Sequence, residues 1–251
     1  MSLEGRTAIV TGAGTGLGLE IARLLSARGA NIVSADILDA ERGAEAARAN
    51  GRRAIATETD VSDKAAVDAM VAAALAEFGT VDILVNNAAI SRGMKLKPFE
   101  EVTVAEFRRM IDVNTLSVLL TCQAVSAHMR ARRYGRIVNM VSGTAFKGAP
   151  NLAAYVASKG AVISLTRALA QEFGPDNVVV NAVSPGYTLT ESNLENTAFD
   201  SVYRPIARDT RALRRDALPE DVARVAAFLA SDDAGFVSGQ IIAADGGSVY
   251  H

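Results

Sequence analysis

Short runs of apolar residues alternate along the chain with longer segments in which apolar residues recur every three or four positions. The longer segments have the period of amphipathic helices, and several end at a glycine, a common helix stop. The short runs lack strict alternation, as strands do when helices cover both faces of a sheet. This pattern predicts an α/β fold with a mainly parallel sheet, whose seven strands are expected at residues 7–12, 31–36, 54–60, 82–88, 136–142, 178–184 and 240–246.

No linker rich in Pro, Gly or Ser divides the chain, so we expect one doubly wound domain over residues 1–251, with helices on both faces of the sheet. Residues 187–217 interrupt the alternation, because they are polar and have little apolar period. Interruptions of this length in compact domains are usually functional lids or disordered loops. We therefore expect a substrate loop there. Its arginines either bind an anionic substrate or are simply solvated; they are Arg204, Arg208, Arg211, Arg214 and Arg215.

The composition indicates a globular protein that does not bind nucleic acid. Hydrophobic residues make up 49% of the chain, enough to bury a large core. The 26 Lys and Arg against 28 Asp and Glu leave a net charge of −2, so no basic surplus could neutralise phosphate backbones. With neither a signal-peptide pattern nor a long apolar run, we expect a cytoplasmic protein with no membrane partner. The single cysteine, Cys122, is interpreted as a small buried residue rather than a reactive thiol.

A glycine-rich segment, Thr11 to Gly18, lies between the first predicted strand and the first predicted helix. Glycines let a backbone turn sharply and approach a pyrophosphate, and the free N–H groups of a helix N-terminus favour an anion. The segment fits G-x-G-x-x-G in no register, but it fits T-G-x-x-x-G-x-G with Gly12, Gly16 and Gly18. In this setting it predicts a dinucleotide-binding loop.

Asp36 ends the second predicted strand, eighteen residues after Gly18, close to where doubly wound folds place a ribose-binding carboxylate. A carboxylate there would accept hydrogen bonds from a free 2′-hydroxyl and repel a 2′-phosphate. Thr15 in the glycine-rich segment adds no compensating positive charge. These residues favour NAD over NADP, the alternative being that Asp36 is an ordinary solvated turn residue.

Tyr155 and Lys159 are four positions apart in a predicted helix, so their side chains share one face. A lysine ammonium near a tyrosine favours the phenolate and lowers the tyrosine pKa toward values suited to proton transfer near neutral pH. On its own this spacing is a weak signal, because any exposed helix can carry it.

Several further motifs occur in a fixed order with the first two: Asn86-Asn87-Ala88, Asn114 in Asp-Val-Asn, Ser142 thirteen residues before Tyr155, and Pro185-Gly186. In this combination the chain resembles the short-chain dehydrogenase/reductase family in its shorter, NAD(P)-dependent form, over essentially its whole length. The resemblance implies a single Rossmann fold and an oxidoreductase that interconverts a secondary alcohol and a ketone by hydride transfer.

The resemblance also implies a role for each matching residue. Tyr155 would be the general acid/base, and Lys159 would bind the nicotinamide ribose and lower the pKa of Tyr155. Ser142 would hold the substrate oxygen, and Asn114 would position a water. The implied cofactor-binding residues are Gly12, Thr15, Gly16, Leu17, Gly18, Asp36, Asp60, Val61, Asn87, Ala88, Tyr155, Lys159, Pro185, Gly186, Thr188 and Thr190.

The chain departs from the family pattern at three places. Ala89 stands where glycine is usual, and Thr188 stands where Ile or Val is usual. Arg214, Arg215 and Ala217 occupy a segment in which glycines are common. None of these departures removes a catalytic group.

The substrate pocket is expected outside the carboxyl ends of the strands, among Gly143, Thr144, residues 91–95 and residues 187–217. Polyol, hydroxy-acid, aryl-alcohol and steroid substrates all remain open. The pocket's apolar walls would come from Met94, Phe146, Leu152 and Tyr187.

Two alternative functions are considered, together with the oligomeric state. An NADP-dependent 3-oxoacyl-carrier-type reductase is disfavoured by Asp36 and Thr15, and a non-catalytic dinucleotide-binding protein by the presence of Tyr155 and Lys159. The apolar, Ala-rich predicted helices and the resemblance together imply a homotetramer, with a monomer as the alternative. We expect no metal, because the chain's two histidines, His128 and His251, have no partner at metal-ligand spacing.

Overall fold

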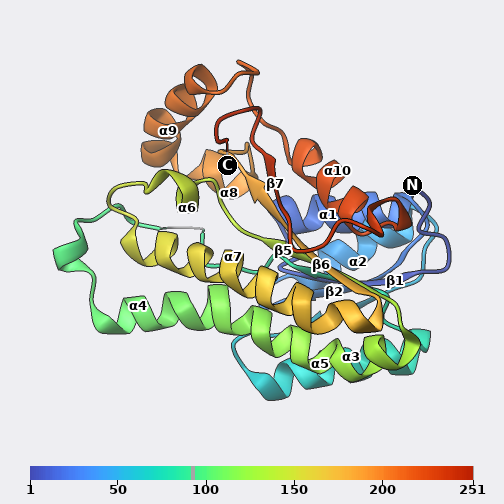
Figure 1. Ribbon diagram of the computed structural model, residues 1–251. Helices are drawn as coiled ribbons and strands as arrows, with labels where there is room; N and C mark the ends of the chain where they lie inside the picture. The colour runs from blue at the N-terminus through green and yellow to red at the C-terminus, as the bar shows by residue number, and fades with distance from the viewer. Residues whose placement is uncertain (92–93, 251) are drawn as a thin grey trace.

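The computed structural model describes residues 1–91 and 94–250, and these residues form one seven-stranded sheet. The strand order is β3-β2-β1-β4-β5-β6-β7, with every neighbouring pair parallel. The order reverses between β1 and β4, so the predicted doubly wound α/β fold is confirmed (Figure 1). The strands are β1 (Thr7–Thr11), β2 (Asn31–Asp36), β3 (Ala54–Glu58), β4 (Ile83–Asn86), β5 (Gly135–Met140), β6 (Val178–Pro185) and β7 (Ile241–Ala244).

Helices cover both faces of this sheet (Figure 1). One layer contains α3, α5 and α7, and the other contains α1, α2 and α10. A π-helical turn, Asp112–Leu116, joins α4 to α5. The helices are α1 (Gly16–Ala27), α2 (Ala40–Ala49), α3 (Lys64–Phe78), α4 (Val104–Ile111), α5 (Ser117–Arg132), α6 (Thr144–Lys147), α7 (Ala153–Phe173), α8 (Glu191–Glu195), α9 (Thr197–Thr210) and α10 (Pro219–Leu229).

Consecutive strand residues are buried in different cores, which explains why the strands lack alternation. Ile9 packs in the core under α3, α5 and α7, whereas Val10 packs in the core under α1 and α10; neither side chain is exposed. The same holds for Leu84 and Val85 in β4. Because β1 and β4 pair in parallel and are buried on both faces, their carboxyl ends lie side by side in a rigid part of the fold.

Residues 187–217 are more ordered than the sequence pattern predicted, because they contain α8 and α9. No side chain described in α9 is fully buried. Its apolar residues Val202, Tyr203 and Ile206 do recur at helical spacing. However, Val202 and Ile206 are half exposed and Pro205 lies within the helix, so the sequence pattern favours a loop. Polar contacts hold the helix instead. Tyr187 donates a hydrogen bond to Asp200 (2.8 Å), and Arg204 binds Asp216 through two nitrogens (3.1 and 2.7 Å).

One helical stretch among the described residues, Val104–Arg132, has the length and hydropathy of a membrane-spanning helix. It corresponds to α4, the π-turn and α5, and 44% of its most apolar window is buried in the fold. Val118 and Val125 on this stretch belong to the core beneath the sheet. A core helix has the same length and hydropathy, so the stretch is weak evidence for a membrane span.

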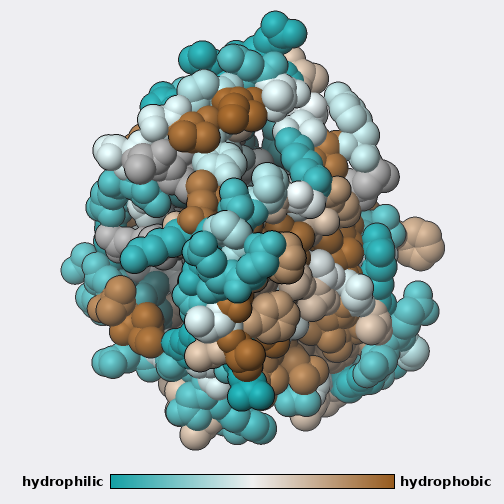
Figure 2. Space-filling model, turned by 90° about the vertical axis from the view of Figure 1, so that its left-hand side faces the viewer, coloured by the Kyte–Doolittle hydropathy of each residue, from teal (hydrophilic) through white to brown (hydrophobic). Residues whose placement is uncertain are grey.

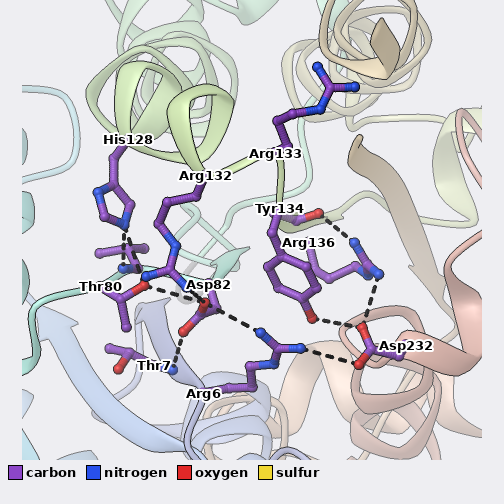
Figure 3. A network of polar contacts seen from close by, with 12 residues as sticks. Arg6, Thr7, Thr80, Asp82, His128, Arg132, Arg133, Tyr134, Arg136 and Asp232 are labelled. Carbon is purple, nitrogen blue, oxygen red and sulfur yellow. Dashed lines mark hydrogen bonds and ion pairs between the residues drawn. The ribbon is translucent and has the colours of Figure 1, made fainter. Parts of the chain in front are cut away.

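A polar network lies at the amino ends of the strands, opposite the predicted site (Figure 3). Asp82 is 1% exposed and accepts hydrogen bonds from the Thr7 N–H (2.9 Å) and from Arg132 (3.3 Å). Arg6 lies 3.7 Å from the same carboxylate and 3.9 Å from the centre of the Tyr134 ring. The network joins β1, β4 and the end of α5 at this edge.

His128 extends this network, and its ring accepts a hydrogen bond from the Val81 N–H at Nε2 (3.2 Å) (Figure 3). Burial and the nearby charge of Arg132 lower the pKa of His128, against the opposing effect of Asp82. The unfolded chain therefore binds this proton more readily, so the stability contribution is present above the unfolded pKa of ~6.5 and is lost as the pH falls.

His128→Gln is expected to keep an acceptor for Val81 but to remove this titration. On going from pH 7.5 to 5.5, the Tm of the wild type should fall further than that of the variant, by about 1–3 °C, the scale of one weak hydrogen bond in a chain of this size. Thermal unfolding at both pH values checks this. Equal decreases in the two proteins would contradict it.

Candidate active site

The glycine-rich loop leaves the amino end of α1 without side-chain caps. Thr15 is the N-cap residue, but its side chain caps no N–H group. The first backbone hydrogen bond of the helix runs from the Leu19 N–H to the Thr15 carbonyl (3.2 Å). The N–H groups of the first turn are thus available to an anion at the switch between β1 and β4, which is where doubly wound folds bind a pyrophosphate.

The end of β4 is tied to this loop through Thr11 and Asn87. The Asn87 amide donates to the carbonyls of Thr11 (2.9 Å) and Gly12 (3.0 Å). The Thr11 hydroxyl in turn accepts the N–H groups of Asn87 (3.0 Å) and Ala88 (3.1 Å). The structure therefore brings the predicted residues of the glycine loop and of the fourth strand together.

Asp36 lies beside the same loop, at the end of β2. One carboxylate oxygen accepts the Gly14 N–H (2.9 Å) and the other accepts the Leu38 N–H (2.9 Å). Each oxygen retains a further lone pair for a ribose hydroxyl. The bond to Leu38 is also that of an ordinary turn residue, so the contacts agree with both interpretations of Asp36.

Asp60 and Val61 follow β3 at the same edge of the sheet. Asp60 accepts hydrogen bonds from the N–H (2.9 Å) and hydroxyl (2.6 Å) of Ser62. The Ser62 hydrogen bonds, opposed by partial burial and helped by Arg109, lower the pKa of Asp60. The carboxylate is therefore fixed in orientation and charged at neutral pH.

Thr188 and Thr190 bring the segment after β6 next to the glycine loop. The Thr188 hydroxyl donates to the Gly186 carbonyl (2.9 Å). Thr190 caps α8, and a Cβ built on Gly16 would lie 3.6 Å from the Thr190 side chain. Gly186 packs against Asp245, where a Cβ would lie 2.9 Å from that side chain. Together with the glycine loop, Asp36 and Asp60, these residues form one continuous edge that suits a dinucleotide.

Tyr155 and Lys159 lie on α7, and Ser142 follows β5. Ser142 lies close enough to the Tyr155 hydroxyl to lower its pKa, and the Ser142 oxygen accepts the Thr144 hydroxyl (2.9 Å). The Lys159 ammonium is 5.9 Å from the centre of the Tyr155 ring and donates to the Met140 carbonyl (2.8 Å). The structure thus groups the predicted acid/base, its neighbouring cation and a hydroxyl at the carboxyl end of β5.

Burial sets the protonation of this group. Burial lowers the pKa of Lys159 to about 8. Burial also raises the pKa of Tyr155, and the nearby Ser142 offsets this only in part. The net shift of the Tyr155 pKa is therefore upward rather than downward as predicted, because burial outweighs the effect of Ser142. The Lys159 ammonium donates to the Met140 carbonyl instead of to Tyr155.

Asn114 lies in the π-helical turn and is 1% exposed. Its side-chain oxygen accepts the Ile90 N–H (2.7 Å), and its nitrogen donates to the Ser158 hydroxyl (3.1 Å). That nitrogen also lies 3.1 Å from the sulfur of Met110. Single π-turns within helices are rare and frequently occur at functional sites. Asn114 contacts the chain after β4 and α7; its predicted role toward a water stays a prediction.

Four of the five arginines in residues 187–217 bind groups of the protein itself: Arg208 contacts its sequence neighbour Asp209 (3.3 Å), and the other three make the following contacts. Arg211 donates to the carbonyls of Ala207, Arg215 and Tyr187 (2.8, 3.1 and 3.0 Å). Arg204 pairs with Asp216, as described above, and Arg215 pairs with Asp221 through two nitrogens (2.6 and 2.7 Å). These contacts favour a structural role for the three arginines over substrate binding.

The remaining predicted residues are placed as follows. Cys122 is buried, and burial raises the pKa of its thiol to about 12. This agrees with its interpretation as a small core residue rather than a reactive thiol. Gly143, Thr144, Phe146 and Leu152 lie in and around α6, between β5 and α7. Residues 92–93 of the predicted pocket and His251 lie outside the described residues. Within the described residues, no group of three or more His, Cys, Asp or Glu side chains could hold a metal ion.

Sequence reasoning included Thr11 in the glycine-rich motif without giving it a role, and it missed Ser158 as a residue of the site. Thr11 binds the end of β4, which is distant in sequence, and Ser158 binds the π-turn. The available signal was that both are polar residues at positions where the pattern predicted burial; Thr11 is 2% exposed and Ser158 is fully buried.

Comparison with known proteins agrees with this geometry. Residues 12–249 match a family model described as enoyl-(acyl carrier protein) reductase. The chain is 41% identical over 247 residues to cis-4-hydroxycyclohexanecarboxylate dehydrogenase of Sinomonas cyclohexanicum, covering 96% of each chain. It is 35% identical over 255 residues to the 3-oxoacyl-[acyl-carrier-protein] reductase of Chlamydia trachomatis, covering 98% of each.

A solved structure is similar in fold along the whole chain. It comes from Beutenbergia cavernae, is described as an NAD(P)-dependent gluconate 5-dehydrogenase, and contains NADP at low occupancy. The two chains are 38% identical with a TM-score of 0.89, and 98% of each is covered. On this sequence match, fold and site, the chain belongs to the short-chain dehydrogenase/reductase family of oxidoreductases that bind a nicotinamide dinucleotide.

Proposed function

We propose that residues 1–251 form one catalytic domain that interconverts a secondary alcohol and a ketone with NAD, using Tyr155 as general acid/base. The observation that carries this proposal is the grouping of Tyr155, Ser142 and Lys159 at the carboxyl end of β5, on the same edge of the sheet as the glycine loop. Ligands in open α/β sheets bind at this edge, near the point where the strand order reverses.

The proposed reaction divides the work between the cofactor and the protein. A bound nicotinamide dinucleotide supplies or accepts the hydride. Tyr155 donates a proton to the ketone oxygen in reduction and accepts the hydroxyl proton in oxidation. Ser142, which lies beside the Tyr155 hydroxyl, holds the same substrate oxygen in this proposal. Lys159 keeps a positive charge next to the tyrosine at pH values below about 8.

The function is tested by following absorbance of the reduced nicotinamide across a panel of secondary alcohols, polyols, hydroxy acids and steroids, with NAD and NADP. Turnover of a simple secondary alcohol supports the proposal. Turnover confined to 3-oxoacyl thioesters with NADPH would favour the second candidate, which the 35% identity to an acyl-carrier reductase supports. Tight NADH binding without turnover would indicate a non-catalytic binding protein.

The proposed preference for NAD depends on Asp36. A 2′-phosphate would place negative charge beside this carboxylate, and like-charge contacts cost several kcal/mol. We expect kcat/KM with NAD to exceed that with NADP by roughly 100-fold, equivalent to ~2.8 kcal/mol. Asp36→Ala should reduce this ratio at least tenfold, whereas Glu58→Ala, at the end of the neighbouring strand, should leave it unchanged. Equal use of both cofactors by the wild type would overturn the assignment.

We also propose that the protein assembles through a groove between α7 and the stretch formed by α4, the π-turn and α5. The groove has a volume of about 500 Å³ and is almost entirely apolar. Figure 2, which views the molecule from the side of α4 and α9, shows hydrophobic residues grouped on the lower part of that face. A second copy of the chain is the proposed occupant, because a two-fold axis would bring the same apolar surface of two copies together and remove both from water. Its lining residues are Ile111, Thr115, Leu116, Leu119, Ala161, Ser164, Leu165 and Ala168.

Leu119→Glu places a charge in this groove and is expected to dissociate the assembly. Burying an unpaired carboxylate costs far more than one apolar contact contributes. Sedimentation should show a species larger than the monomer for the wild type and for Leu38→Glu, since Leu38 is 81% exposed elsewhere on the surface. A monomeric wild type, or an unchanged Leu119→Glu variant, would contradict the proposal.

A further inference from the structure

We propose that Ser158 is a positioning residue for the reaction: it joins α7, which carries Tyr155 and Lys159, to the π-turn that carries Asn114. This inference rests on the proposed function, because it concerns how the groups of that site are held. Ser158 directly precedes Lys159 and is three positions after Tyr155. Its side chain points to the protein interior, where it is fully buried.

The Ser158 hydroxyl uses both of its hydrogen-bonding capacities. It donates to the Tyr155 carbonyl (2.8 Å) and accepts the Asn114 amide (3.1 Å). A hydroxyl has one proton to donate, so its direction is fixed by the Tyr155 carbonyl and its lone pairs face Asn114. The two residues that it bridges are 41 positions apart and belong to different helices.

A second contact strengthens the same junction. The Thr115 hydroxyl, next to Asn114 in the π-turn, donates to the Ser158 carbonyl (3.0 Å). Ser158 is thus bound to the π-turn through its side chain and through its backbone. A shift of the π-turn along α7 would break both hydrogen bonds together.

The junction continues to the other side of the site. Asn114 accepts the Ile90 N–H (2.7 Å), so the chain of contacts runs from Tyr155 through Ser158 and Asn114 to the segment after β4. Without the Ser158 hydroxyl, the Asn114 amide would retain only the sulfur of Met110 (3.1 Å) and a long contact to the Ile90 carbonyl (3.4 Å). A buried amide that loses its best acceptor reorients, and displacements of ~1 Å at a reacting group can cost ~100-fold in rate.

The test compares Ser158→Ala with a matched control, Thr166→Val. Thr166 lies on the same helix, is fully buried, donates to the Val162 carbonyl (2.8 Å) and accepts the Asn139 amide (2.9 Å). Each variant therefore deletes one buried hydroxyl with the same kinds of partner. Both should lose similar stability, as judged by Tm.

Only Ser158→Ala is expected to lower kcat, by about tenfold or more, and to displace the pH profile of kcat, with NADH affinity changed by less than about threefold. In an Asn114→Ala background the effect of Ser158→Ala should largely disappear, because residues that act through each other are not additive. Thr115→Val, which removes the second hydroxyl, should act in the same direction. Equal kcat values and pH profiles in Ser158→Ala and Thr166→Val would overturn the proposal.

Amide hydrogen exchange gives a readout that does not depend on turnover. Exchange at Ile90 and at residues 112–117 should accelerate in Ser158→Ala and stay unchanged in Thr166→Val. If the wild type turns over no substrate, the proposed function fails, yet this local acceleration still supports the junction. Unchanged exchange in Ser158→Ala would overturn it whatever the activity.

Discussion

Tyr155→Phe is expected to lower kcat by about 10²–10⁴-fold, the range attributed to one general acid/base, while NADH affinity changes little. Phenylalanine keeps the ring in the same packing but has no hydroxyl to exchange a proton with the substrate oxygen. Steady-state kinetics with the best alcohol of the panel and NADH fluorescence titration measure the two quantities.

Tyr134→Phe is the matched control for this variant. Tyr134 lies at the opposite edge of the sheet, where its hydroxyl donates to Asp232 (2.9 Å), so its loss should leave kcat within about twofold. A Tyr155→Phe variant that retains more than a tenth of wild-type kcat would exclude Tyr155 as the proton-transfer group.

The raised pKa of Tyr155 also predicts how each direction of the reaction depends on pH. Oxidation needs the phenolate form of Tyr155. Because burial raises the pKa of Tyr155, only a small fraction of it is ionised at neutral pH, so kcat/KM for oxidation should rise with pH through the alkaline range. Reduction needs the protonated hydroxyl and should keep its rate at neutral pH. Opposite pH dependences of oxidation and reduction would both be explained by the ionisation of Tyr155.

Gly18→Ala is expected to weaken NADH binding by about 10–100-fold, because overpacking at a tight backbone contact costs ~1–3 kcal/mol. A Cβ on Gly18 would lie 2.0 Å from the Gly12 carbonyl oxygen and 2.5 Å from the Asn87 amide. Neither neighbour is the free end of a flexible side chain, since Gly12 is backbone and Asn87 is held by two carbonyls. The glycine loop must therefore shift away from α1.

Isothermal titration with NADH measures this effect, and Gly174→Ala serves as the control. A Cβ on Gly174 would have no neighbour within 4 Å, and its backbone is right-handed helical, so alanine fits there without strain. Affinity for NADH should be unchanged in this control. Wild-type affinity in Gly18→Ala would show that the loop adapts and that its close contact with α1 is dispensable.

The central strands were predictable because β1, β4, β5 and β6 are buried on both faces and form short apolar runs, whereas β3 at the edge of the sheet is only half-buried. The second predicted strand, 31–36, coincides with β2, whereas the run at 54–60 extends beyond β3, which ends at Glu58. The motif residues of the site were predictable for a related reason. They follow buried strands directly, and parallel strands bring their carboxyl ends to one edge.

The rest depended on contacts that a linear pattern does not contain. The polar contacts Tyr187–Asp200 and Arg204–Asp216 hold α9, and its short apolar stripe, which includes Val202 and Ile206, stays half exposed. The upward shift in the Tyr155 pKa follows from burial in the folded site rather than from its spacing to Lys159. The role proposed for Ser158 depends on its hydrogen bond with Asn114, which is 44 positions away in sequence.

The buried ammonium of Lys159 links the chemistry of the site to the proton balance of unfolding. Its pKa is about 8 in the folded protein and returns to ~10.4 in an unfolded chain. Between these values the unfolded chain binds a proton that the folded protein has released, so stability rises with pH across this window. Below pH 8 the folded state carries the full cost of a charge held away from water. Lys159 therefore lowers the stability of the native fold most at pH values below about 8, where its ammonium is charged and can support proton transfer by Tyr155.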